Sequence, residues 1–301
     1  MFYALRQRLN YRWFDFKNRA VLSTPPLVCD PSGPFFLTQL CRRDLIMYLA
    51  AVKTFSQSIR PSRVHALDDG SLTAEDRALL RAHIDGIVFL ELKDYRSPHC
   101  PVGGCWERLL AVADLCQSRY VVQLDSDTIT LGDISEVRDS ITNEYSFVIS
   151  VKDNQEIEYM PSAVATARGH LASSNGIQPV SEASFDKLEN YETMKYARGC
   201  AGFTGFAKGA VKREFIEDIS RQMYQAVGER WNEWGTEQVA SNIAAANSPK
   251  ARMLPHPKYC NCTRIREGTT QFIHFIGYCR FKSGLYSRHV ANAVALLNRK
   301  P

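Results

Sequence analysis

The segment "VVQLDSDTIT" (residues 121–130) decides how the rest of the sequence is interpreted. Four residues typical of a buried β-strand come first, and Asp125 and Asp127 follow, one residue apart. Two carboxylates this close repel each other, and each takes up a proton more readily unless a cation lies between them. The segment therefore indicates either a metal site at the end of a strand or a solvated turn or helix cap.

Strands and helices are predicted to alternate around this segment. Apolar patterning predicts strands over 34–40, 62–67, 86–92, 120–124 and 147–150, and helices over 42–59, 73–84 and 105–117. Thr73 is placed to cap the second of these helices. The alternation predicts an α/β fold in which helices cover both faces of a mostly parallel sheet. Ligands of such sheets bind beyond the carboxyl ends of the strands, which is where the two aspartates lie.

The chain is less regular after residue 150. Residues 153–199 are predicted to form a long, partly helical excursion of the kind that often carries binding function. The segment "GCAGFTGFAKGA" (199–210) follows, and its four glycines are expected where the backbone turns tightly or approaches a ligand.

Composition narrows the range of partners and compartments. The 301 residues carry a net charge of +5, and no basic run interleaved with aromatics occurs beyond the N-terminus, so no nucleic-acid partner is expected. Nine cysteines without a secretory leader favour buried free thiols in a reduced cytoplasm. Zinc binding through residues 99–105 and 260–262 is an alternative, although their spacings differ from the usual paired knuckles. No apolar run approaches the ~20 residues that span a bilayer.

Residues 1–33 are predicted to be an N-terminal arm attached to a single domain over 34–301. Residues 1–19 mix aromatic and aliphatic side chains with basic ones: Phe2, Tyr3, Leu5, Leu9, Trp13 and Phe16 among Arg6, Arg8, Arg12, Lys17 and Arg19. This mixture is typical of peripheral contact with an anionic membrane. Alternatively the aromatic side chains pack onto the domain and the arginines are simply solvated.

A second motif lies near the C-terminus, in "FIHFIGYCRFK" (272–282). His274 is followed by Gly277, which permits close backbone approach, and then by Arg280 and Lys282, whose side chains suit phosphate. An imidazole joined to two carboxylates makes a mixed oxygen and nitrogen site that suits a divalent ion such as manganese. The alternatives are a core histidine and a surface ion pair of Arg280.

The two motifs together resemble glycosyltransferase family 8, the retaining enzymes of the GT-A (Rossmann-like) fold. Four further segments are similar to that family: "HALDDGSLTAED" (65–76), "WERLLAV" (106–112), "GTEQVASN" (235–242) and "AGFTGF" (201–206). The resemblance spans roughly residues 34–285. Glu237 stands where the family has aspartate, Arg280 where it usually has lysine, and Cys200 where it has asparagine.

The resemblance implies a role for individual residues. Asp125, Asp127 and His274 would bind Mn²⁺ or Mg²⁺, which bridges the diphosphate of a nucleotide sugar, most often a UDP-sugar. The residues implied in donor binding are Asp125, Arg108, Gly277, Arg280, Lys282 and Asp68. Gln238 corresponds to the residue beneath the reacting sugar carbon, and Glu237 would orient Arg108 or contact a sugar hydroxyl. Asp153 and Gly202 are implied in acceptor binding. A turn explains Asp153 equally well and Asp68 almost as well.

The sequence therefore predicts a metal-dependent hexosyltransferase that acts with retention on a cell-envelope glycan or glycolipid. It is expected in the cytoplasm, at the cytoplasmic face of a membrane. Two alternatives stay open. One is an inverting GT-A transferase with Glu237 or Asp153 as base, and the other is a non-catalytic domain that binds sugar nucleotides.

Overall fold

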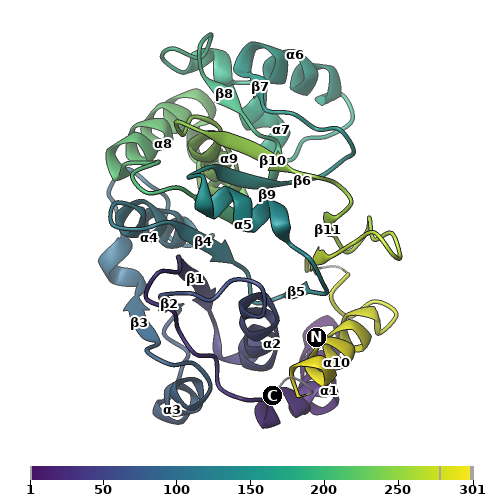
Figure 1. The fold of residues 1–301 in the computed structure, drawn as a ribbon. Coiled ribbons are helices and arrows are strands. Elements are labelled where there is room, and N and C mark those ends of the chain that lie inside the picture. Colours follow the sequence, from purple (N-terminus) through teal and green to yellow (C-terminus); the bar gives the residue numbers. More distant parts are fainter. Residues whose placement is uncertain (1, 278, 299–301) are drawn as a thin grey trace. The chain divides into compact units, whose positions relative to one another are not determined.

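The computed structural model describes residues 2–277 and 279–298, with the backbone alone described for residues 2–4 (Figure 1). The chain divides into two compact units. Unit 1 comprises Met1–Glu91, Leu124–Arg138 and Pro257–Pro301, and unit 2 comprises Leu92–Gln123 and Asp139–His256. The described residues do not include the side chains of Met1, Phe2 and Tyr3, which belong to the predicted N-terminal arm.

Unit 1 contains two groups of strands and four α-helices among its described residues. Its helices and strands are α1 (Phe2–Asn18), β1 (Phe35–Leu40), α2 (Leu45–Ser56), β2 (Arg63–Asp68), α3 (Ala74–His83), β3 (Val88–Glu91), β5 (Thr128–Thr130), β11 (Tyr259–Asn261), β12 (Phe272–His274) and α10 (Leu285–Leu297). The helix α5 (Ser135–Thr142) begins in unit 1 and ends in unit 2. The strands β1, β2 and β3 pair in parallel, with Leu40 opposite Asp68.

Unit 2 contains the excursion and the glycine-rich segment. Its helices and strands are α4 (Trp106–Cys116), β4 (Val121–Leu124, whose last residue belongs to unit 1), β6 (Ser146–Ser150), β7 (Glu158–Tyr159), α6 (Met160–His170), α7 (Ile177–Glu182), β8 (Lys195–Tyr196), β9 (Gly199–Phe206), α8 (Arg213–Val227), α9 (Thr236–Ala246) and β10 (Ala251–Leu254). The strand order is β10-β6-β9-β4, with β10 parallel and β9 antiparallel to β6. The α/β class and the mostly parallel pairing predicted from the sequence are confirmed.

The predicted elements between residues 34 and 150 all occur within a few residues of their expected bounds. Thr73 caps α3 as expected, because its hydroxyl accepts from Asp76 N while Asp76 accepts from Thr73 N. Such a reciprocal cap satisfies two backbone donors that a helix start otherwise leaves unpaired.

The glycines over residues 199–210 were predicted to mark tight turns or close approach to a ligand. The prediction of tight turns was wrong for the first eight residues, which form the buried strand β9, and approach to a ligand stays a prediction. The glycines of β9 serve packing. A Cβ at Gly199 would collide with Val148 on β6, and one at Gly205 would collide with Phe147. β9 can lie this close to β6 only because these two positions lack side chains.

Two cysteines form a disulfide, so the expectation of free thiols was wrong for Cys262 and Cys279. Their Cα atoms lie 6.4 Å apart, within the range of disulfides. Disulfides are more typical of oxidising compartments than of cytoplasm, and the cytoplasmic location therefore stays a prediction. Among the described residues, the cysteines at 29, 41, 100, 105, 116, 200 and 260 take part in no disulfide.

None of the helices in the described part of the chain has the length and hydropathy required to cross a membrane.

Candidate functional site

One strand pairing in unit 1 brings His274 to the two aspartates. β5 runs antiparallel to β12, with Thr128 directly opposite His274. The amide of Phe275 donates to the carbonyl of Asp127 at 2.8 Å, which extends the pairing by one residue. Asp125 lies in the preceding turn, where its carbonyl accepts from the Thr128 hydroxyl at 2.9 Å. The chain therefore turns directly from β4 into β5. This turn brings the carboxylates of Asp125 and Asp127 close to His274 at the end of β12.

The three side chains converge closely enough to share one metal ion. His274 Nε2 lies 3.1 Å from Asp127 Oδ1 and 3.5 Å from Asp125 Oδ2. One ligand atom from each residue lies within 4.8 Å of the other two. Asp127 and His274 are buried, and Asp125 retains a quarter of its side-chain exposure. Water can therefore reach the group from the side of Asp125.

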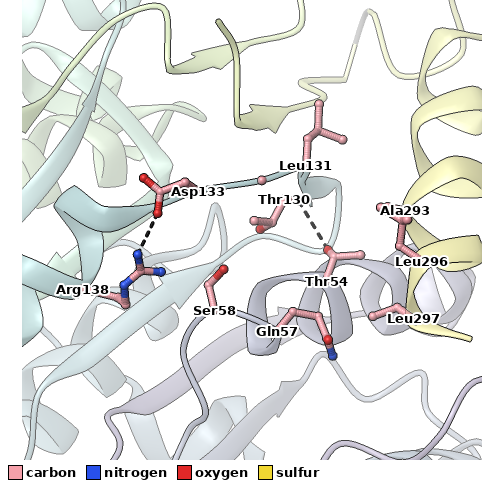
Figure 2. A pocket seen from close by; sticks show the side chains of 11 residues that line it. Thr54, Gln57, Ser58, Thr130, Leu131, Asp133, Arg138, Ala293, Leu296 and Leu297 are labelled. Atoms are coloured by element: carbon pink, nitrogen blue, oxygen red, sulfur yellow. Dashed lines mark hydrogen bonds and ion pairs between the residues drawn. The ribbon is translucent and has the colours of Figure 1, made fainter. Parts of the chain in front are cut away.

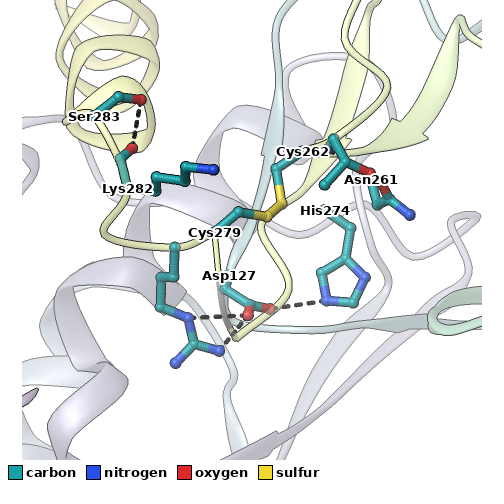
Figure 3. The surroundings of a disulfide bond; sticks show 9 residues. Asp127, Asn261, Cys262, His274, Cys279, Lys282 and Ser283 are labelled. Carbon is teal, nitrogen blue, oxygen red and sulfur yellow. Dashed lines mark hydrogen bonds and ion pairs between the residues drawn. A yellow bond between two sulfur atoms is a disulfide. The ribbon is translucent and has the colours of Figure 1, made fainter. Parts of the chain in front are cut away.

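Arg280 forms a largely buried ion pair with the other oxygen of Asp127. Arg280 Nε donates to Asp127 Oδ2 at 3.1 Å, and Arg280 Nη2 donates to the same oxygen. Figure 3 shows Asp127 facing His274 beside the Cys262–Cys279 disulfide. Burial by itself raises the pKa of Asp127, but the positive charges of His274 and Arg280 outweigh burial and hold this pKa well below its usual range. Asp127 is therefore a carboxylate whose Oδ1 is directed toward His274.

The donor set fits a divalent cation. Two carboxylates and one imidazole suit an ion of the manganese type, and the partial exposure of Asp125 leaves an approach for an anionic ligand. Within the described residues, no other group of three acidic, histidine or cysteine side chains lies close enough together to hold a metal ion. Cys100 and Cys105, on which the zinc alternative partly rested, belong to no such group there.

The other residues of unit 1 that were predicted to bind the donor differ in side-chain exposure. Lys282 is exposed, and Gly277 is exposed with no atom of a described residue outside its chain neighbours within 4 Å of an added Cβ. Asp68, by contrast, is buried at the end of β2, where Oδ1 accepts from Gly70 N at 2.8 Å and Oδ2 pairs with Arg77 at 2.6 Å. The turn alternative accounts for these contacts of Asp68, and its donor-binding role stays a prediction.

The predicted catalytic residues lie together in unit 2, at the start of α9. Gly235 precedes the helix with a φ of 106°, a conformation that residues with a side chain rarely adopt. Glu237 then pairs with Arg108 of α4 at 3.2 Å, and both side chains are almost wholly buried, at 6% and 5% exposure. The contact between Glu237 and Arg108 suggested by the sequence therefore exists. This ion pair fixes the first turn of α9, where Gln238 directly follows Glu237.

Gln238 lines a cavity of about 250 Å³ in unit 2. The Oε1 atom of Gln238 accepts a hydrogen bond from Ala201 N of β9 at 3.4 Å. Gly202, which was predicted to bind the acceptor, is the residue after Ala201. Three polar residues form part of the lining of the cavity, where Glu182 accepts from the Tyr196 hydroxyl at 2.9 Å and pairs with Arg198 at 2.7 Å. Sequence reasoning missed these three residues, since they lie in the irregular excursion and match no motif.

Asp153, the other residue expected to bind acceptor, pairs with His256. Asp153 Oδ1 lies 2.7 Å from His256 Nδ1, and about half of the Asp153 side chain is exposed. The His256 side chain is itself buried, and its Nε2 has no hydrogen-bond partner among the described residues. No sequence pattern indicated this pair, because the two residues lie in separate loops.

A cavity of about 370 Å³ in unit 1 contains none of the predicted site residues. Figure 2 shows that apolar side chains of α10 line one side of it, and that Asp133 and Arg138 form an ion pair on the other. The volume of this cavity therefore does not connect it to the site predicted from the sequence.

No family model and no curated protein matches the chain. Among solved structures, it is similar to the galactosyltransferase LgtC in complex with donor and acceptor sugar analogues (TM-score 0.45, 12% identity, 89% of this chain and 97% of that chain). It is also similar to mouse xyloside xylosyltransferase 1 (TM-score 0.47, 11% identity, 82% and 98%). A third similar structure is core-mannan synthase A from Aspergillus fumigatus in an Mn/GDP form (TM-score 0.44, 10% identity, 86% and 85%). Similarity at this level assigns neither a substrate nor a reaction to this chain.

Proposed function

We propose that this protein is a metal-dependent glycosyltransferase that moves a hexose from a nucleotide sugar, a UDP-sugar, to a glycan or glycolipid acceptor with retention. The observation that carries the proposal is the convergence of Asp125, Asp127 and His274 within 4.8 Å. Three ligands that leave a partly exposed side suit an ion that also binds a diphosphate. The family resemblance of the sequence motifs supports the same assignment.

In this proposal unit 1 binds the metal and the diphosphate. Asp125, Asp127 and His274 would hold an Mn²⁺ or Mg²⁺ ion, and the ion would supply positive charge that stabilises the departing nucleoside diphosphate. Arg280 holds Asp127 as a carboxylate and fixes its orientation, and the exposed Lys282 supplies a further positive charge for phosphate.

The other proposed roles belong to residues of unit 2, each considered within that unit. The amide oxygen of Gln238 stabilises the positive charge of an oxocarbenium-like transition state, because an amide is a weak nucleophile but a fixed dipole. Glu237 and Arg108 position Gln238 by holding the start of α9. Gly202 and Asp153 contribute to acceptor binding. The product belongs to a cell-envelope polysaccharide or glycolipid made at the cytoplasmic face of a membrane.

Metal-dependent binding of sugar nucleotides tests this function directly. With Mn²⁺ present, a UDP-sugar should raise the melting temperature of the protein and release UDP on turnover. Asp125→Asn removes a metal ligand that lies outside the Asp127–Arg280 ion pair, so the variant should stay folded and lose both effects. Asp186→Asn, which alters a surface ion pair with Arg168 at 2.6 Å, is the matched control. Binding without transfer to any acceptor would favour the non-catalytic alternative.

One observation favours the inverting alternative as a second candidate. Inversion requires a carboxylate base near the acceptor hydroxyl. Glu237 is buried against Arg108, whereas Asp153 is half-exposed and held by His256, which leaves Asp153 the more accessible base. NMR of the anomeric configuration of the product distinguishes the two: retention supports the proposal, and inversion together with an inactive Asp153→Asn variant supports Asp153 as base.

A further inference from the structure

The N-terminal helix α1 packs against the rest of unit 1 through one face. Tyr11 and Phe14 are buried, at 9% and 1% exposure, and Asn18 beside them is buried as well. The Tyr11 ring lies 4.8 Å from that of Phe281, and the Phe14 ring lies 4.7 Å from that of Tyr286 on α10. Figure 1 shows α1 and α10 side by side. The described part of α1 is therefore fixed to unit 1, and one of its faces points away from it.

Large apolar side chains occupy that outward face. Leu5, Leu9, Trp13 and Phe16 are 56%, 57%, 61% and 71% exposed. Their spacings of four, four and three residues place all of them on one side of a helix, opposite Tyr11 and Phe14. The rings of Trp13 and Phe16 stack at 6.1 Å. A continuous row of exposed side chains of this size marks an interaction surface.

Basic residues lie along both edges of the row. With about 100° between successive helical residues, Arg8 and Arg12 fall along one edge, and Arg6 and Lys17 fall along the other. All four are exposed, and Lys17 Nζ lies 4.8 Å from the Trp13 ring. The outward face is thus apolar in its centre and positively charged on both sides.

We propose that this face of α1 binds the surface of an anionic lipid bilayer. The apolar row enters the boundary between headgroups and acyl chains, and the two basic edges meet the anionic headgroups. A second copy of this chain would bring basic edges against basic edges, so charge complementarity favours lipid over self-association. The inference goes beyond the proposed function and does not depend on it, because it concerns the protein without substrate.

The two faces of α1 also connect this surface to the candidate metal site. The Tyr11 hydroxyl accepts a hydrogen bond from Arg280, and Arg280 pairs with Asp127. The helix that meets the bilayer therefore contacts the residue that orients a candidate metal ligand. All three residues belong to unit 1.

Vesicle flotation of the full chain, without metal or nucleotide, tests the proposal. Vesicles of phosphatidylcholine with about one third phosphatidylglycerol should carry the protein upward, vesicles of phosphatidylcholine alone should not, and salt should weaken binding. Trp13→Ser with Phe16→Ser removes two apolar side chains and should weaken binding at least about tenfold. Arg8→Gln with Arg12→Gln removes two charges and should weaken it by about thirtyfold.

Matched controls separate this face from general exposure and charge. Trp234→Ser replaces a tryptophan that is 80% exposed in unit 2, and Arg60→Gln replaces an exposed arginine outside α1. Both should bind vesicles as the wild type does, and circular dichroism confirms that each variant is folded. The proposal is overturned if the wild type does not float with anionic vesicles, or if the α1 variants bind unchanged. Sedimentation that reveals a dimer disrupted by the same substitutions, without vesicle binding, would assign the face to a second copy and also overturn it.

Discussion

Breaking the buried ion pair between Arg108 and Glu237 should destabilise unit 2 strongly. The charged atoms lie 3.2 Å apart, with only 5% and 6% of the two side chains exposed. Glu237→Gln leaves the guanidinium in the same enclosed position without its counter-charge. Removing one partner of a buried pair typically lowers the free energy of unfolding by about 3–5 kcal/mol, because the remaining charge is desolvated and uncompensated. We expect a loss of about 3 kcal/mol, at the lower end, since the introduced amide oxygen can still accept a hydrogen bond from Arg108.

A nearby pair provides the control for this experiment. Arg230 and Glu233 lie 2.7 Å apart, but their side chains are 36% and 46% exposed. Surface pairs contribute about 0.2–1 kcal/mol, so Glu233→Gln should change stability by less than about 1 kcal/mol. Urea unfolding followed by tryptophan fluorescence measures both variants. The expected effect of burial is wrong if Glu237→Gln costs no more than Glu233→Gln, because water would then reach the Arg108–Glu237 pair.

Three other perturbations test separate parts of the structure. Gln238→Ala should lower kcat about a hundredfold with little change in donor affinity, and a pure KM effect would contradict its role in the transition state. Reducing the disulfide that joins Cys262 to Cys279, 17 residues apart, should lower unfolding stability by about 3 kcal/mol, whereas a Cys262→Ser, Cys279→Ser variant should not respond to reductant. Burial and the nearby Asp44 raise the pKa of Asp15 from 3.8 to about 6, so ionised Asp15 opposes folding at neutral pH. Asp15→Asn should therefore raise the melting temperature at neutral pH, and this gain should shrink as pH falls from 6 to 3.8; a gain of equal size at both ends would contradict the shift.

The sequence was most informative where local pattern and packing agree. The strands up to residue 150 have continuous apolar runs, and their identity follows from burial on both faces. The meeting of Asp127 with His274 was predicted from motif resemblance, although the antiparallel pairing of β5 with β12 that produces it was not foreseen. Strands of three residues carry too little periodicity to be recognised, and their pairing depends on the rest of the fold.

Long-range packing explains what the sequence did not predict. The glycines of β9 looked like turn residues, because nothing local reveals that Val148 and Phe147 press against positions 199 and 205. Lys53 is another case: it is buried inside α2, where its ammonium group lies 2.8 Å from the Thr24 hydroxyl and 2.9 Å from the Pro25 carbonyl. Burial lowers the pKa of Lys53 to about 8. Lysine is almost never buried without such partners, and these come from a segment 28 or more positions away.

Manganese spectroscopy tests most directly whether Asp125, Asp127 and His274 bind one divalent ion. Mn²⁺ added to the protein with UDP should lose its free-ion paramagnetic signal at one equivalent per chain, and pulsed measurements should detect coupling to a directly bound imidazole nitrogen. His274→Gln should abolish the nitrogen coupling, and Asp125→Asn should weaken binding of the ion. Stoichiometric Mn²⁺ binding by the wild type with no coupled nitrogen, or with a nitrogen signal that survives His274→Gln, would place the ion elsewhere and contradict a site shared by these three residues.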